Sequence, residues 1–256
     1  MRESCKQLLT ETMEKSVIRT DGAPLDPGVP SQVVIPAWLG LGSDELTLTN
    51  CQIAIVDFGE AYDPLVTKRT STHTPIILAP PEARFLDSEN GEYLSFSSDI
   101  WSLACVIWQL FGDGPLFQTF AGTWEELTIE HVEVFGKLPD RWWNKWSTRS
   151  DWFDDDGTKN VKKEKYRPWH GFYETWEKRF PKYIRQARDR PTLNVGLWSA
   201  EEQEAFGEMM KMMLVFEPSK RATIEEILQC DWMQQWGFPE FQRMQDAMRA
   251  DSTPLE

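Results

Sequence analysis

Apolar residues recur at helical spacing in several stretches of the chain. Residues 98–111 are apolar nearly all the way round, which is typical of a helix that other elements cover, and Gly112 is expected to end it. Residues 5–18 and 124–135 each carry one apolar face, so we expect a shorter amphipathic helix in each. The most hydrophobic helix is therefore predicted near the middle of the chain.

Two further helices are marked by their first residues. Ser199 and Glu202 form a capping-box pattern, in which each side chain bonds the other residue's backbone N–H, and Thr223 and Glu226 repeat it. The second box predicts a helix over residues 224–229. The first opens a helix with one apolar face, made of Phe206, Met209, Met210, Met213 and Leu214.

Only short stretches have the pattern of a strand. Residues 46–49 alternate leucine and threonine, and residues 53–56 predict a buried strand that ends at Asp57. Residues 20–36 are rich in proline and glycine, which predicts an extended linker. Charged residues dominate 147–197, so we expect a surface insert there. The predicted fold class is mainly α with a small β element.

Composition indicates a packed globular protein, since 41% of the residues are hydrophobic and 12% are aromatic. The tryptophans that gather between Trp101 and Trp176 either fill a core or face a partner, and core packing is the simpler interpretation. The formal net charge of −14 disfavours binding to nucleic acid or to an anionic membrane. It suits a basic partner, with solubility as the alternative explanation.

The cysteines carry no metal or disulfide pattern. Cys5, Cys51, Cys105 and Cys230 include no CxxC pair, so we expect reduced thiols, as in the cytoplasm or the nucleus. The first residues are too polar for a signal peptide. The longest apolar stretch is about half a membrane span, so no membrane association is expected.

The first candidate site is Asp57-Phe58-Gly59, directly after a predicted buried strand. A carboxylate at a strand end can hold Mg²⁺, which prefers oxygen ligands and takes one or two carboxylates together with substrate phosphates. Gly59 lets the chain turn away without a Cβ clash. The alternative is an ordinary strand-to-turn junction that Asp57 caps.

Two later segments carry charges that need partners. Two prolines stiffen the backbone before Glu82, which needs a cation if it is buried. Arg221 is the candidate, because an Arg–carboxylate pair would pin two distant segments bidentately. Asp99, in the first turn of the apolar helix, could cap that helix or bind the backbone amides of a neighbouring loop.

In order and spacing, these motifs resemble the second half of a eukaryotic protein kinase. The Asp-Phe-Gly triplet is followed in turn by Pro81-Glu82, by Asp99-Ile100-Trp101 and by Arg221. Three segments are similar to SR-protein-kinase-like sequences of filamentous fungi, in the CMGC group: 57–61, 80–85 and 98–105. The resemblance implies serine/threonine phosphorylation, with basic, Arg/Ser-rich proteins as substrates.

The resemblance also implies an organisation for the chain. Residues 1–50 would be a spacer, and residues 51–240 a kinase C-terminal lobe without its N-lobe and catalytic loop. Within the lobe, 57–82 would be the activation segment and about 147–197 a charged insert. Residues 241–256 would be a tail.

The Asp-Phe-Gly motif would contribute to cofactor binding, and the resemblance implies that the cofactors are ATP and Mg²⁺. Asp57 would bind the Mg²⁺ that bridges the phosphates, and Phe58 would pack toward the N-lobe. The activation segment departs from the family pattern, because Pro80 stands where alanine is usual and no tyrosine lies just before it.

The later motifs would shape the lobe. Glu82 would close the activation segment by pairing with Arg221, and Thr74 would lie near the peptide-binding floor. Asp99, two residues before Trp101, would hold the backbone of the catalytic loop.

Other parts of a kinase are not found in these residues. Residues 40–43 do not complete a Gly-rich loop, and no strand lysine precedes Asp57. The histidines, His73, His131 and His170, all follow Asp57, so none begins a His-Arg-Asp loop in family order. We therefore expect no phosphotransfer, weak or no ATP binding and poor solubility for this chain alone.

Three interpretations stay open. The first is a truncated serine/threonine kinase. The second is a non-catalytic, kinase-like module that binds basic proteins, suggested by the tryptophan-rich region and the acidic charge. The third is an unrelated helical protein with chance motifs.

Overall fold

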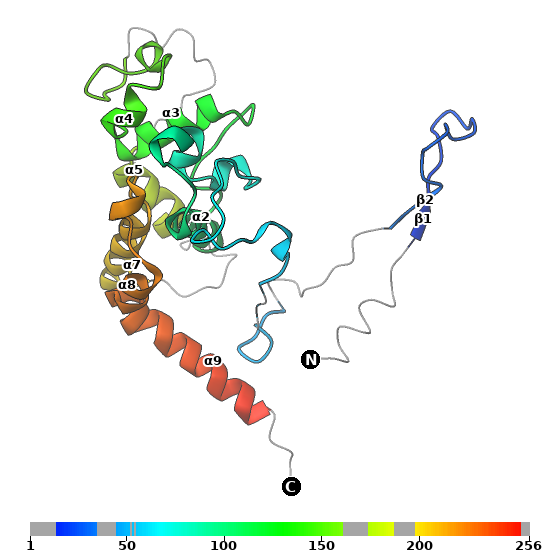
Figure 1. Cartoon of the computed structure of the whole chain (residues 1–256). Coiled ribbons are helices and arrows are strands. Elements are labelled where there is room, and N and C mark those ends of the chain that lie inside the picture. The colour runs from blue at the N-terminus through cyan, green and yellow to red at the C-terminus, as the bar shows by residue number, and fades with distance from the viewer. Residues whose placement is uncertain are drawn as a thin grey trace. The chain divides into compact units, whose positions relative to one another are not determined.

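The computed structural model describes residues 14–34, 45–51, 53, 55–160, 174–186 and 198–251, and Figure 1 shows the chain as a cartoon. The chain divides into two compact units. One comprises residues 54–242, and the other comprises 1–53 together with 243–256. The described part of the chain is mainly helical and holds a single two-stranded sheet.

That sheet lies in the unit that contains residues 1–53. Strand β1, Glu14–Ser16, pairs antiparallel with β2, Gln32–Val34, and Glu14 lies opposite Val34. The helix predicted over residues 5–18 is therefore wrong for residues 14–16, and residues 5–13 lie outside the described part. The β-branched Val17 extends the ribbon, because its N–H donates to the Ser31 carbonyl at 2.9 Å.

Among the described residues, neither of the two strands predicted before Asp57 is formed. Residues 46–49 make a turn, in which the Asn50 side chain accepts the Thr47 N–H at 2.7 Å. Ile53 and Val56 are 95% and 75% exposed and lie in no strand. A strand gains stability only from a partner strand or a covering face, and the described residues offer these segments neither.

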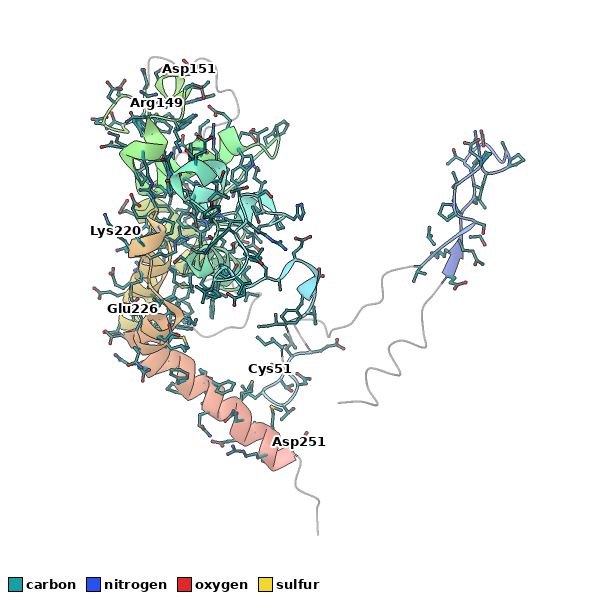
Figure 2. The ribbon with its side chains drawn as sticks, viewed as in Figure 1. Cys51, Arg149, Asp151, Lys220, Glu226 and Asp251 are labelled. Carbon is teal, nitrogen blue, oxygen red and sulfur yellow. The ribbon has the colours of Figure 1, made fainter. Side chains whose placement is uncertain are left out.

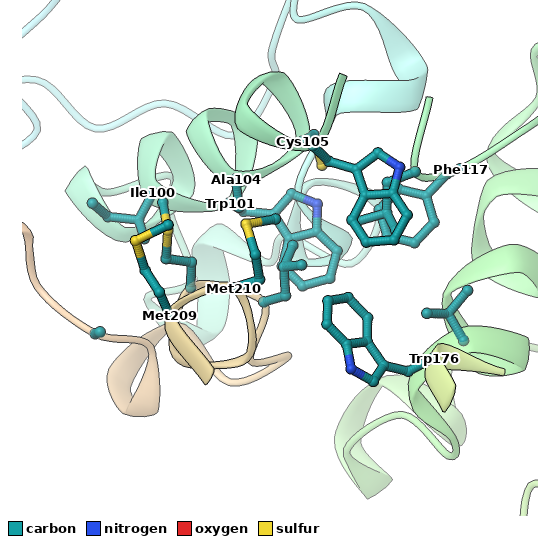
Figure 3. Packing of buried hydrophobic residues seen from close by; sticks show 14 of the residues in the cluster. Ile100, Trp101, Ala104, Cys105, Phe117, Trp176, Met209 and Met210 are labelled. Carbon is teal, nitrogen blue, oxygen red and sulfur yellow. The ribbon is translucent and has the colours of Figure 1, made fainter. Parts of the chain in front are cut away.

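The core of the unit 54–242 is built around helix α2, Phe96–Phe111, which ends at Gly112 as predicted. Ser95 and Ser98 form its capping box, so the helix begins two residues before the predicted start. Figure 2 draws the side chains of this unit, and Figure 3 shows α2 side chains packing against methionines of α7, Ala200–Met213. Trp101 and Trp108 are fully buried here.

A second cluster explains most of the tryptophan-rich region. It lies around α3, Trp124–Phe135, and α4, Asp140–Trp143. Core packing is confirmed for these tryptophans, since Trp142, Trp143 and Trp146 are each at most 3% exposed. They pack with Phe85 and Phe153.

Part of the predicted surface insert belongs to the core. Helix α5, Trp176–Phe180, continues as the π-helical segment η7, Pro181–Arg185, and it buries Trp176 and Ile184. Arg179 is also buried and lies 2.9 Å from the Glu130 carboxylate. The charge density of this stretch predicted exposure, but a buried charge is stable when it is paired and hydrogen-bonded. Residues 161–173 and 187–197 lie outside the described part.

The remaining helices follow in order. Helix α8, Ile224–Gln229, begins at the predicted capping box of Thr223 and Glu226, and η9, Met233–Gly237, leads into α9, Phe238–Asp251. None of the described helices is long and apolar enough to cross a membrane. Short 3₁₀ segments are η1 Phe58–Glu60, η2 Ile76–Leu78, η3 Pro81–Arg84, η4 Ser88–Asn90, η5 Arg149–Asp151 and η8 Pro218–Lys220.

Candidate functional site

The ion pair expected between Glu82 and Arg221 is present. Arg221 Nη1 donates to Glu82 Oε1 at 3.0 Å, and Nη2 donates to Oε2 at 2.9 Å. Both residues are only 4% exposed, so the pair is shielded from water. Pro81 opens η3 and presents Glu82 from its first turn. This geometry joins η3 to the segment after η8 through a bidentate contact.

Groups from the start of α2 complete this junction. Ser98 Oγ donates to Glu82 Oε1 at 2.9 Å, and the Arg221 guanidinium lies 5.2 Å from the centre of the Trp101 ring. Arg221 also donates to the carbonyl of Val215 at 3.0 Å. The structure therefore brings the Pro-Glu motif, the Asp-x-Trp helix start and the late arginine together. Sequence reasoning assigned no partner to Ser98, although Ser95, three residues earlier, is the type of residue that favours a helix N-cap.

The segment between Gly59 and Pro81 folds back over the start of α2. Ser102 Oγ donates to the Leu78 carbonyl at 2.9 Å, which ties η2 to the helix. A pocket of about 340 Å³ lies between this segment and α2. Its lining includes hydroxyl groups and one carboxylate of α2: Ser71, Thr72, Thr74, Ser95, Ser98, Ser102 and Asp99. Such a lining can accept and donate hydrogen bonds to a peptide backbone or a side chain.

Charged side chains of the segment also line this pocket. Glu60 accepts from Arg69 Nη1 at 2.9 Å and lies 3.1 Å from His73 Nδ1. His73 and Arg69 hold the pKa of Glu60 below its ordinary value. Arg69 also lies over the Tyr62 ring, 4.3 Å from its centre. These contacts fold the segment onto itself, and sequence reasoning assigned no role to Tyr62 or Arg69.

Two predicted residues share the pocket. Thr74 Oγ1 lies 2.6 Å from Thr72 Oγ1, and Asp99 lines the pocket from the first turn of α2. Partial burial raises the pKa of Asp99. Burial is also the main cause of the raised pKa of Tyr62; the charge of Arg69 opposes this rise, and the charge of Asp99 adds to it. A hydrogen-bond donor that enters the pocket would therefore stabilise the charged form of the Asp99 carboxylate.

The first motif lies outside this pocket. Asp57 has a left-handed backbone, with φ 65° and ψ 61°, and its side chain is exposed. Phe58 is 67% exposed. Across the described ranges there is no group of three or more His, Cys, Asp or Glu side chains that could hold a metal. The role of Asp57 as a Mg²⁺ ligand therefore stays a prediction.

Comparison with known proteins gives a consistent result. Residues 45–233 match the protein kinase domain family. The chain is similar to the human dual specificity protein kinase CLK4, with 26% identity over 211 residues that cover 78% of this chain and 37% of the relative. It is also similar to the serine/threonine-protein kinase SRPK of Physarum polycephalum, with 26% identity over 148 residues, 56% of this chain and 30% of the relative. The chain thus spans about a third of the length of these relatives.

Proposed function

Because the chain belongs to the protein kinase family, we propose that residues 54–242 provide the substrate-binding lobe of a serine/threonine kinase. The observation that carries this proposal is the junction of Glu82, Arg221 and Trp101, which pins the segment between Gly59 and Pro81 beside α2. A pinned segment with a hydroxyl-lined pocket offers a fixed surface for a peptide.

We propose basic, Arg/Ser-rich proteins as the substrates. Two facts support this choice: the net charge of −14 and the similarity to a kinase named SRPK. A negative protein field attracts positively charged peptides and raises their rate of encounter.

The nucleotide chemistry needs groups beyond the described site. In this family Mg²⁺ supplies charge neutralisation on the ATP phosphates, and Asp57 is the residue we propose as its ligand. Asp99 would accept hydrogen bonds from the backbone of a catalytic loop, because it lines the pocket. We propose that the 256-residue chain alone transfers no phosphate.

The test has two parts. The purified chain is incubated with Mg-ATP and a peptide of Arg-Ser repeats, and incorporated phosphate is measured. A chimera then places the part of human CLK4 up to its catalytic loop before residue 45. We expect phosphate transfer only from the chimera, and loss of that transfer in Asp57→Asn but not in Asp155→Asn, an exposed aspartate of the 153–159 turn. Phosphate transfer by the chain alone, or a folded chimera that transfers none, would contradict the proposal.

The second candidate is a non-catalytic module that binds basic proteins. Burial of Trp142, Trp143 and Trp146 removes these described tryptophans as a reason for it. The acidic charge still favours it, and binding without phosphotransfer to the Arg-Ser peptide would be its signature.

A further inference from the structure

A groove lies on the lobe between α7, α8 and η9, and none of its lining residues lines the pocket beside Asp99. Its volume is about 620 Å³. Five carboxylates line it: Glu201, Glu204, Glu208, Glu226 and Asp231. None of the described residues that line it is a lysine or an arginine. Figure 2 labels Glu226 in α8.

The acidic side of the groove results from the spacing of glutamate residues along α7. Glu201, Glu204 and Glu208 are three and four residues apart, so they form one ridge along the exposed side of the helix. Carboxylates at this spacing repel one another and destabilise an isolated helix. Lys211 offsets part of this charge through an exposed pair with Glu208 at 2.8 Å.

The groove also has an apolar part. Ala205, Met209 and Met212 form the neighbouring ridge of α7, and Trp236 of η9 lines the groove with them. Met212 is 36% exposed, so the groove presents thioether and aromatic surface to solvent. Methionine is flexible and polarisable, which suits a surface that receives side chains of varied shape.

We propose that this groove docks a segment of a partner protein in which arginine or lysine residues alternate with apolar side chains. The carboxylates select positive charge, because each rim contact gains from a complementary potential. Met212 and Trp236 select an apolar anchor, whose burial supplies the affinity that exposed ion pairs do not. All of the lining residues except Gln235 and Trp236 lie within residues 45–233, which match the kinase domain, but docking there requires neither ATP nor phosphotransfer.

The test measures binding to the full 256-residue chain. The probe is a fluorescein-labelled peptide of repeated Arg-Arg-Leu triplets, followed by fluorescence anisotropy without nucleotide. The groove variant is Glu204→Gln with Glu208→Gln and Asp231→Asn. The matched control is Glu89→Gln with Asp154→Asn and Asp155→Asn, which removes the same charge from exposed positions outside the groove.

We expect the groove variant to weaken binding about tenfold and the control variant to change it less than about twofold. Replacing leucine by serine in the peptide, or Met212→Ser in the chain, should each weaken binding about threefold or more. Equal weakening by the two triple variants would show general charge attraction and overturn the proposal. Unchanged binding of the serine peptide, or no binding at about 1 mM chain, would also overturn it. Thermal melts of every variant distinguish lost binding from lost folding.

Discussion

The Arg221 guanidinium lies 5.2 Å from the centre of the Trp101 ring while its two terminal nitrogens bond the Glu82 carboxylate. One arginine thus joins the central helix to the end of the proposed activation segment. Because its charge is buried with a single carboxylate partner of opposite sign, its contribution depends on that partner.

Removing that partner should destabilise the lobe strongly. We expect Glu82→Ala to lower the free energy of unfolding by about 3–5 kcal/mol, since it leaves the Arg221 charge buried without compensation. Urea unfolding followed by circular dichroism measures this. The double variant Glu82→Leu with Arg221→Met should recover much of the loss, because an apolar pair avoids the desolvation cost. A Glu82→Ala chain as stable as the parent would show that the pair does not hold the segment.

His131 should make the lobe less stable in acid. It is 1% exposed, and its ring centre lies 4.5 Å from that of Phe117. Burial lowers the pKa of His131 to about 3, with the charges of Arg221 and Arg84 as smaller causes. The folded protein therefore keeps the ring neutral, whereas the unfolded chain takes up a proton below about pH 6.5.

Keeping this ring neutral costs no stability above about pH 6.5, where the ring is also neutral in the unfolded chain. As the pH falls from there toward about 3, the free energy of unfolding decreases by about 1.4 kcal/mol per pH unit. His131→Phe should flatten the loss of stability between about pH 7.5 and about pH 5 by about 2 kcal/mol. His73→Gln, at a residue whose side chain is 79% exposed, is the control and should retain the full pH dependence. Identical slopes for all three chains would rule out this role of His131.

Glu125 should hold the loop that follows α4. Its carboxylate accepts from Arg84, Trp146, Thr148 and Trp152, at 2.6 to 3.1 Å. Glu125→Gln leaves one acceptor oxygen for these donors, so we expect a loss of about 2 kcal/mol in the free energy of unfolding. Faster trypsin cleavage after Arg149 would locate the loosened segment. Glu204→Gln, at an exposed position of α7, should change neither.

Gly112 should tolerate no side chain. A Cβ there would lie 2.8 Å from the Trp108 carbonyl oxygen and 3.1 Å from both Ile184 Cδ1 and the Tyr183 carbonyl oxygen. We expect Gly112→Ala to cost about 1–3 kcal/mol, because two of these contacts are with backbone that cannot rotate away. At Gly59 the nearest atom would be Asp57 Oδ1 at 3.7 Å, so Gly59→Ala should be within about 0.5 kcal/mol of the parent. Thermal denaturation of the two variants compares them directly, and a similar loss in both would contradict the packing described at Gly112.

Helices with a capping pattern or a strong apolar face were the part of the fold that could be predicted best from sequence, although the helix predicted over 5–18 was wrong for residues 14–16. The helix over 124–135 and that over 224–229 have the predicted bounds, because capping residues and apolar periodicity act within one or two turns. The strands predicted at 46–49 and 53–56 failed because a strand depends on a neighbour that a local pattern does not contain.

The same distinction applies to the candidate site, where some residues could be predicted from the sequence and others could not. Glu82 and Arg221 could be paired from sequence, because a charge that is buried needs an opposite charge. Tyr62, Arg69 and Ser98 could not be placed, since the irregular segment that brings two of them to the pocket has no periodic signal. Arg179 was hidden by the charges around it, although its partner Glu130 stands out as a carboxylate within a buried stretch of α3.

The pairing of Glu82 with a residue 139 positions later has a consequence for synthesis on the ribosome. Glu82 leaves the exit tunnel long before Arg221, so the segment before α2 has no cation to close on until most of the lobe has been translated. During that interval the Glu82 carboxylate stays hydrated, and the tryptophans of α2 lack the α7 side chains against which they pack. A nascent chain stalled before residue 221 should therefore be held by chaperones, and release of those chaperones should coincide with the emergence of the last helices.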